Sequence, residues 1–147
     1  MTTTTIASTA RKGGCLCGAV RYEVTAAPSM AGFCYCESCR RLSGSGHAFH
    51  ALVPEEALKA SGTVKSFQWK ADSGSTVTTS FCPTCGSPLF GKSSGMPGMV
   101  TFRAASLDDP NVLSPQMAVY AKRLLRWDHL DPAIAAFDEM PPMPPAS

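Results

Sequence analysis

The seven cysteines of this 147-residue chain fall into three groups, and no other residues suggest chemistry as specific. The first group is C-L-C at residues 15–17, the second is C-Y-C-E-S-C at residues 34–39, and the third is C-P-T-C at residues 82–85. A structural zinc ion needs four thiolates in a tetrahedron, each about 2.3 Å from the metal, usually as two close pairs from distant chain segments. The first and third groups therefore predict one zinc site made of Cys15, Cys17, Cys82 and Cys85.

Each of these two pairs needs a particular local backbone. The C-P-T-C spacing lets a tight turn present two sulfurs to one metal, and Gly86 lets the chain leave with a positive φ. In a flat strand, the side chains of Cys15 and Cys17 would lie about 7 Å apart, too far for one tetrahedral ion. We therefore expect a turn or bulge at residues 15–17, which the flanking glycines permit.

The middle group offers three thiolates, and three protein ligands on zinc are the mark of a catalytic site with an open fourth position. The sequence leaves three other interpretations open: a closed structural site, free thiols with little metal, or a disulfide formed in air. His47 and His50 follow shortly after and could carry protons or supply a fourth ligand, although ordinary core or surface histidines are commoner. We expect the two histidines to share one face of a strand. The predicted metal-binding and catalytic residues of this group are Cys34, Cys36 and Cys39.

Arg40 and Arg41 directly follow the third cysteine of the middle group. Three thiolates carry more negative charge than a divalent ion offsets, so such a site delivers sulfur better than it polarises a carbonyl. The two guanidinium groups could balance that charge or bind the carboxylate of a substrate, which makes them the candidate co-substrate-binding residues. The Asp108-Asp109 pair, in contrast, is typical of a turn and a helix cap rather than of paired acid and base.

The composition describes a globular protein of one domain, with 44% hydrophobic and 16% charged residues. A net charge of +2 without a long basic run gives no reason to expect a nucleic-acid partner. No apolar run approaches the roughly 20 residues of a membrane span, and the N-terminus lacks a secretory pattern. Cysteines at metal-binding spacing are typical of a reducing compartment, so we expect a cytoplasmic protein without a membrane partner. The sequence leaves open whether the protein forms a homodimer.

Short strands are the elements that must position these cysteines. Residues 18–25 alternate, with Val20, Tyr22 and Val24 on one face, which predicts a half-buried strand. A helical turn is expected at residues 54–59, and Asp131-Pro132 predicts a helix over residues 133–140. Further strands are expected over residues 30–35, 48–53, 63–70, 76–81, 98–104 and 116–122. The large aromatic residues expected in the core are Phe67, Trp69, Phe81, Phe90, Phe102 and Trp127.

These expectations combine into one mostly β domain with no internal repeat. It consists of seven or eight short strands in small antiparallel sheets that the four-cysteine zinc site holds together. We place the zinc-binding domain at residues 13–140. A disordered Thr-rich tail precedes it at residues 1–12, and a Pro-rich tail follows at residues 141–147.

Four stretches together resemble a known family. They are G-G-C-L-C-G-A-V-R-Y at 13–22, C-Y-C-E-S-C-R at 34–40, F-C-P-T-C-G-S-P-L at 81–89, and S-L-D-D at 106–109 followed by Pro115 and Trp127. In order and spacing the chain is similar to the glutathione-dependent formaldehyde-activating enzyme family, also called the centromere-protein-V-like family. The resemblance covers residues 13–140.

The resemblance implies a β-tent fold and two zinc ions. The structural zinc falls on the cysteines at 15, 17, 82 and 85, and the catalytic zinc falls on those at 34, 36 and 39. The implied activity is that of a carbon–sulfur lyase run in reverse, which condenses glutathione with formaldehyde to S-(hydroxymethyl)glutathione. Glutathione and a small aldehyde are thus the expected small-molecule partners.

The chain departs from the family pattern at two places that do not touch the thiolates. Tyr35 stands where the family often has histidine, and Ala118-Val119 stands where a His-Ile pair is common. Two alternative functions follow, since members of a large family need not share one reaction. One is a related zinc-dependent lyase or hydrolase acting on another small metabolite, and the other is a zinc-held binding module without catalysis.

Overall fold

The computed structural model describes residues 11–141, which divide into two compact units. The first unit comprises Met1–Met30 and Ala51–Leu113, and the second comprises Ala31–His50 and Ser114–Ser147, each as far as it is described. The protein is mostly β, as predicted. Strand β1 begins at Arg11, so the last two residues of the expected N-terminal tail belong to a strand. The rest of that tail, and all but residue 141 of the C-terminal one, lie outside the described residues.

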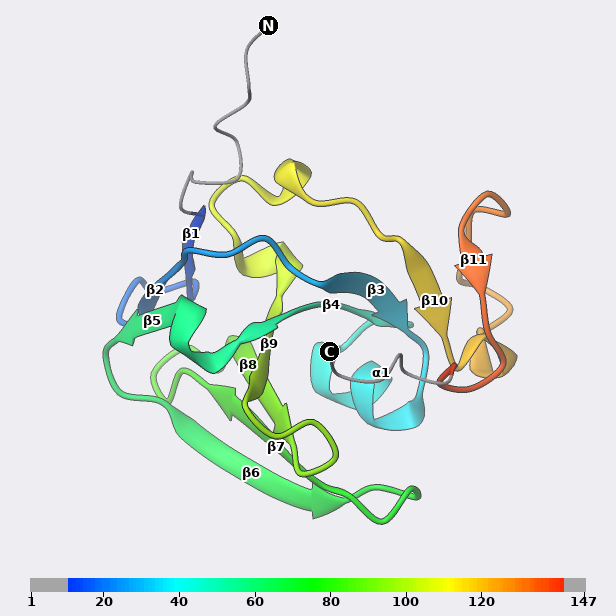
Figure 1. The fold of residues 1–147 in the computed structure, drawn as a ribbon, viewed down its shortest axis with the longest axis horizontal. Coiled ribbons are helices and arrows are strands. Elements are labelled where there is room, and N and C mark those ends of the chain that lie inside the picture. The colour runs from blue at the N-terminus through cyan, green and yellow to red at the C-terminus, as the bar shows by residue number, and fades with distance from the viewer. Residues whose placement is uncertain (1–10, 142–147) are drawn as a thin grey trace, which may run out of the picture. The chain divides into compact units, whose positions relative to one another are not determined.

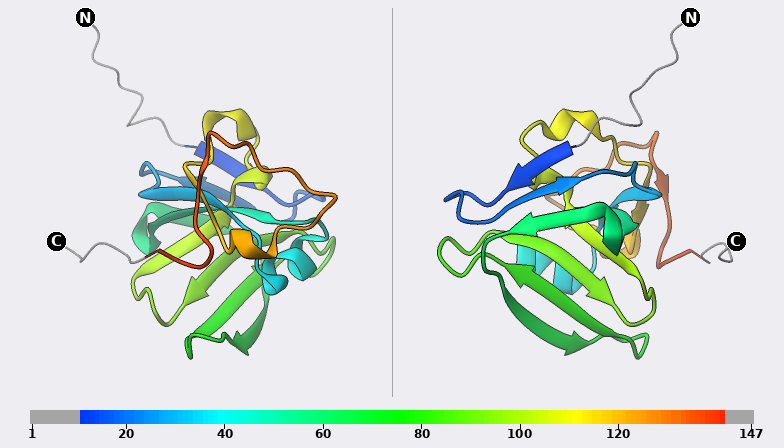
Figure 2. Two further views of the ribbon diagram at one scale, coloured as in Figure 1. Left: turned by 90° about the vertical axis from the view of Figure 1, so that its right-hand side faces the viewer. Right: turned by 60° about the vertical axis from the view of Figure 1, so that its left-hand side comes forward.

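A small antiparallel sheet in the first unit contains β1 (Arg11–Gly14), β2 (Arg21–Val24) and β5 (Leu58–Ser61), with β2 in the middle. Both views in Figure 2 show β1 and β2 as neighbouring blue segments. The side chains of Val20, Tyr22 and Val24 are all buried, which confirms the predicted apolar face of this strand. Strand β5 was not predicted from the sequence.

Four antiparallel strands of the first unit form a meander in the order β6, β7, β8, β9 (Figure 1). They span Lys65–Lys70, Thr76–Phe81, Pro88–Ser93 and Met99–Arg103. The β-branched run at residues 76–81 predicted β7 correctly. Strand β8 was not predicted, although Pro88 occupies the first strand position, where a missing N–H is tolerated. The C-P-T-C motif is thus the connection between β7 and β8.

Tyr22 joins the small sheet to the meander inside the first unit. Its ring packs edge-on against Phe90, with the centroids 5.3 Å apart, and lies 5.8 Å from the ring of Phe102. Ser106 donates its hydroxyl hydrogen to the carbonyl oxygen of Arg103, so the Tyr22 hydroxyl donates to Ser106 Oγ, at 2.6 Å. Burial raises the pKa of Tyr22 to about 12. The β2 face is therefore fixed by apolar packing and by one satisfied buried hydroxyl.

Two of the aromatic residues predicted to be in the core are on the surface instead. Phe102 is fully buried, but the Phe67 side chain is 58% exposed and that of Trp127 is 70% exposed. Phe67 lies on β6, which pairs with β7, and its ring stacks on Trp69 with the centroids 6.1 Å apart. The core prediction is therefore wrong for Phe67 and Trp127.

The second unit contains β3 (Met30–Cys34), α1 (Glu37–Ser43), β10 (Met117–Val119) and β11 (Ala135–Ala136). Strand β10 pairs in parallel with both β3 and β11, so the expectation of antiparallel pairing is wrong here. Strand β4 (Ala48–Pro54) begins in this unit and continues into the first.

The helix predicted over residues 133–140 does not form. Asp131 does start a turn, since its side chain accepts a hydrogen bond from the Ala133 N–H and its carbonyl oxygen accepts one from Ile134. The chain then extends as β11, and the Phe137 N–H donates to the carbonyl oxygen of Ala118. Pairing with β10 therefore outweighs the local helical signal.

The remaining helical segments are single turns of 3₁₀ type. The one at Glu55–Ala57 confirms the helical turn expected there, and the others span Ala104–Ser106, Pro110–Val112 and Ala121–Arg123. Asp109 caps the turn at Pro110–Val112 by accepting a hydrogen bond from the Asn111 N–H, as the sequence indicated. Within residues 11–141, no helix is both long and apolar enough to cross a membrane.

Candidate metal centres

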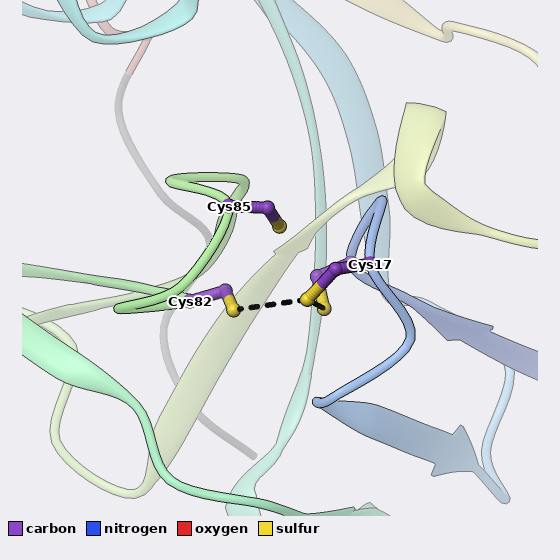
Figure 3. A group of neighbouring side chains, drawn as sticks. Cys17, Cys82 and Cys85 are labelled. Carbon is purple, nitrogen blue, oxygen red and sulfur yellow. Dashed lines mark hydrogen bonds between the residues drawn. The ribbon is translucent and has the colours of Figure 1, made fainter.

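The first and third cysteine groups meet in the first unit. The four sulfurs of Cys15, Cys17, Cys82 and Cys85 all lie within 4.8 Å of one another. Figure 3 shows Cys17 and Cys82 facing each other across two chain segments, with their sulfurs 3.7 Å apart, and Cys85 beside them. Cys82 is fully buried, whereas Cys17 is exposed at the edge of the cluster. The expected gathering of these four residues is thus present in the fold.

The C-L-C pair lies on a turn, as the sequence predicted from the neighbouring glycines. The Gly18 N–H donates to the Cys15 carbonyl at 3.1 Å, and Gly18 has a φ of 82°, a conformation that favours glycine. The Val20 N–H donates to Cys15 Sγ at 3.2 Å, which holds that sulfur in place. This turn brings the sulfurs of Cys15 and Cys17 to 3.7 Å, in place of the wider spacing of a flat strand.

The C-P-T-C pair sits on a second turn, between β7 and β8. The Gly86 N–H donates to the Cys82 carbonyl at 2.8 Å, and Gly86 has the positive φ that the sequence predicted, 80°. The Cys82 N–H in turn donates to the carbonyl oxygen of Ser87, at 3.0 Å. Cys82 is therefore held by two backbone hydrogen bonds from within the turn.

Ser87 links the two turns, a role that no sequence pattern indicated. Its hydroxyl oxygen accepts a hydrogen bond from the Leu16 N–H at 3.0 Å and lies 3.2 Å from Cys85 Sγ. Hydrogen bonds from the side chain and backbone of Ser87 lower the pKa of Cys85 to about 5. Ser87 therefore favours the thiolate form of one member of the cluster.

The geometry of the four sulfurs suits a tetrahedral ion. Zinc–sulfur bonds of about 2.3 Å place neighbouring sulfurs about 3.8 Å apart in a regular tetrahedron. The 3.7 Å separations observed for Cys17 with Cys15 and with Cys82 match that distance. These residues therefore fit the zinc ion that their spacing predicts, without rearrangement of the backbone.

The middle cysteine group forms a second cluster, in the second unit. The sulfurs of Cys34, Cys36 and Cys39 lie within 4.8 Å of one another. Cys34 ends β3, Cys36 is the N-cap of α1, and Cys39 lies on α1. The sequence analysis missed this helix, although its signals were present: an acidic first turn, two arginines in the last turn, and Gly44 with a φ of 74° after it.

Hydrogen bonds from the two neighbouring thiols lower the pKa of Cys36 below that of the other thiols in this cluster. The thiols of Cys34 and Cys39 hydrogen-bond to its sulfur and lower the pKa of Cys36, and the backbone N–H of Cys39 adds a contact of 3.4 Å. The same interactions raise the pKa values of Cys34 and Cys39. The three thiols thus hydrogen-bond to one another, and a cation bound at their centre would take the place of thiol protons.

The two histidines have different surroundings, so the expectation that they share one face of a strand is wrong. His50 lies on β4, whereas His47 precedes that strand by one residue. The Nε2 atom of His50 lies 3.3 Å from Cys39 Sγ. His47 instead uses Nδ1 to bind Asp128 Oδ2 at 2.8 Å, and its ring packs against Tyr35, with the centroids 5.0 Å apart.

The two arginines of α1 differ in what they contact. Arg41 Nε pairs with Glu37 Oε2 at 2.9 Å, one turn earlier on the helix, and both side chains are exposed. No ion pair among the described residues involves Arg40. Arg40 is therefore the arginine whose charge is not already bound to a carboxylate.

Asp128 is a residue of this unit that the sequence analysis did not single out. Its side chain packs on Gly46, where an added Cβ would come within 2.1 Å of Oδ2. The carboxylate can hydrogen-bond His47 only because Gly46 has no side chain. No sequence signal joins Asp128 to residues so far away along the chain.

Gly46→Ala is expected to destabilise the protein by about 1–3 kcal/mol, because the Asp128 carboxylate must retreat and lose His47. Denaturant unfolding of the variant measures this cost. In an Asp128→Ala background the obstructing carboxylate is absent, so the added cost of Gly46→Ala should vanish. An equal cost in both backgrounds would contradict this explanation.

Comparisons with known proteins agree with this arrangement. The family model described as "Glutathione-dependent formaldehyde-activating enzyme" matches residues 10–123. No curated protein matches the chain. A crystal structure of a Rhodobacter sphaeroides protein has a similar fold, with a TM-score of 0.53 and 20% identity. That match covers 86% of this chain and 98% of the other, and at this identity it supports the fold alone.

Proposed function

The chain belongs to the glutathione-dependent formaldehyde-activating enzyme family, and from this premise we propose that it condenses glutathione with formaldehyde. The product is S-(hydroxymethyl)glutathione. A carbon–sulfur bond forms, the carbon–oxygen double bond becomes single, and the thiol proton ends on the former carbonyl oxygen. The reaction needs no oxidant or reductant. It is the reverse of a carbon–sulfur lyase step.

The observation that carries this proposal is the gathering of three thiols at the start of α1. Three thiols fit a zinc site with an open position, and we propose that Cys34, Cys36 and Cys39 hold this ion. When bound, such an ion lowers the pKa of a coordinating thiol, so that a thiolate is available at neutral pH. The sulfur of Cys36 accepts a hydrogen bond from the Cys39 N–H, and this bond favours its thiolate form.

Arg40 is proposed to bind a carboxylate of glutathione. It lies one residue after Cys39 on α1, and no ion pair of the described residues occupies it. Arg41 would have to release Glu37 before it could do the same. Arg40 is thus the first candidate for substrate binding, and Arg41 adds positive charge to the same helix end.

The four-cysteine centre is proposed to have a structural role. Its four sulfurs occupy all the positions of a tetrahedral ion and leave none for a substrate. Reduced thiols at both centres are consistent with a cytoplasmic location, which we propose for this protein.

Proton NMR of formaldehyde mixed with glutathione tests the proposal. The reaction also runs without enzyme, so we expect the purified protein with two zinc ions per chain to exceed the background rate. Arg40→Gln should raise KM for glutathione, while Arg126→Gln, which removes an exposed arginine of the same unit, should not. A rate equal to the background with fully loaded protein would refute the proposed activity.

A further inference from the structure

His50 is the one histidine found in contact with a cysteine cluster among the described residues. Its Nε2 atom lies 3.3 Å from Cys39 Sγ. In a tetrahedral zinc site, a sulfur at about 2.3 Å and a nitrogen at about 2.0 Å from the ion are about 3.5 Å apart. The observed separation is therefore close to that of two ligands bound to the same ion.

We propose that His50 is the fourth ligand of the metal at Cys34, Cys36 and Cys39, and that a thiol can displace it. The donor set is then three sulfurs and one nitrogen, a combination that proteins use for zinc. A neutral imidazole suits this position, because the three thiolates already exceed the charge of a divalent ion. A fourth thiolate would add more negative charge to the centre.

The position of His50 explains why this ligand is displaceable. The three cysteines come from one continuous segment, residues 34–39, whereas His50 comes from β4. The three sulfurs all lie within 4.8 Å of one another, and His50, which contacts Cys39, is not part of that group. The imidazole must therefore move toward the ion to bind it, whereas the sulfurs are already gathered.

Neither of the other histidines can take this place. The chain has three histidines in all. The Nδ1 atom of His47 is bound to Asp128, and its ring packs on Phe33 and Tyr35. His129 is exposed. These two residues therefore provide matched controls for a substitution of His50.

The displacement step depends on the proposed function, whereas the donor set of the resting centre does not. If His50 held the ion together with the three cysteines, the protein would supply all four ligands of a tetrahedral site, and a substrate thiol would bind only by replacing the histidine nitrogen.

Cadmium NMR tests the donor set without any measurement of turnover. Protein loaded with cadmium at both centres should show two resonances, one from four sulfurs and one from three sulfurs and a nitrogen. With isotope-labelled histidine, the second resonance should show coupling to a histidine nitrogen. The first resonance serves as an internal control in the same sample.

His50→Ala should abolish the coupling, move only the second resonance, and weaken the second metal by at least about tenfold. His47→Gln and His129→Gln should leave both resonances in place. Added glutathione should remove the coupling in the unsubstituted protein and move its second resonance toward that of the four-sulfur centre.

Three results would overturn the proposal: a single bound cadmium ion, no histidine coupling in the unsubstituted protein, or a coupling that survives excess glutathione. Because coupling is read from the unsubstituted protein, the outcome does not depend on whether the His50 variant folds. Turnover of formaldehyde is measured separately. If cadmium couples to a histidine nitrogen but formaldehyde is not turned over, the proposed function is refuted, while the assignment of His50 as the fourth ligand is supported.

Discussion

Replacement of Cys82 by serine is expected to leave the protein largely unfolded. Cys82 is fully buried, and its sulfur lies 3.7 Å from that of Cys17, so the substitution removes one of the four sulfurs proposed to bind the structural zinc. A structural zinc ion contributes roughly 10–16 kcal/mol of apparent binding free energy in small zinc-binding domains. The whole free energy of unfolding of a typical domain is only about 5–15 kcal/mol. Loss of this centre therefore removes as much stability as the domain has.

Circular dichroism and zinc analysis of the Cys82→Ser variant measure this effect, and removal of zinc by a chelator should reproduce it in the unsubstituted protein. Ser87→Ala is the matched control. It deletes the hydroxyl that contacts Leu16 N and Cys85 but keeps all four sulfurs. We expect it to weaken zinc binding by about 10–100-fold with the fold preserved. A Cys82→Ser protein that melts at the original temperature would show that this centre is not structural.

Cys36→Ser should give the opposite combination: a folded protein that has lost its activity. Cys36 is the N-cap of α1, where its sulfur accepts a hydrogen bond from the Cys39 N–H. Serine is among the preferred N-cap residues, so the helix keeps its cap. Zinc, however, loses one of the three sulfurs at the second centre. We expect one zinc ion per chain instead of two, and a fall in kcat/KM of at least about a hundredfold.

Ser38→Ala provides the control for Cys36→Ser. It alters the residue between Cys36 and Cys39 without removing a sulfur. We expect this variant to keep both zinc ions and its turnover, with a melting temperature close to that of the unsubstituted protein. Unchanged turnover in Cys36→Ser itself would show that the second cluster has no part in the reaction.

Some features were predictable because they depend on short-range spacing. The alternation of Val20, Tyr22 and Val24 marks a strand with one buried face, and the β-branched run at residues 76–81 became β7 without change. The turns at the outer cysteine pairs followed from the glycines beside them. The glycine at 86 has the positive φ that its place after a C-x-x-C motif requires.

Other features were not predictable, since they depend on segments that meet only after folding. Asp131 starts a turn in place of the expected helix, and residues 135–136 pair in parallel with β10. Trp127 looks like a core residue by type and is exposed. Asp128 pairs with His47 because folding brings two distant loops of the second unit together.

The sequence alone determined which sulfurs belong in pairs. Short spacing between cysteines, together with a neighbouring glycine, restricts the local backbone to a turn that brings the two sulfurs together. It also determined that three cysteines remained for a second cluster. Only the tertiary structure decided which histidine accompanies that cluster, since type and spacing do not distinguish His47 from His50. Folding places His50 beside Cys39, across the turn that follows α1, and His47 beside Asp128, which is 81 residues away in the sequence.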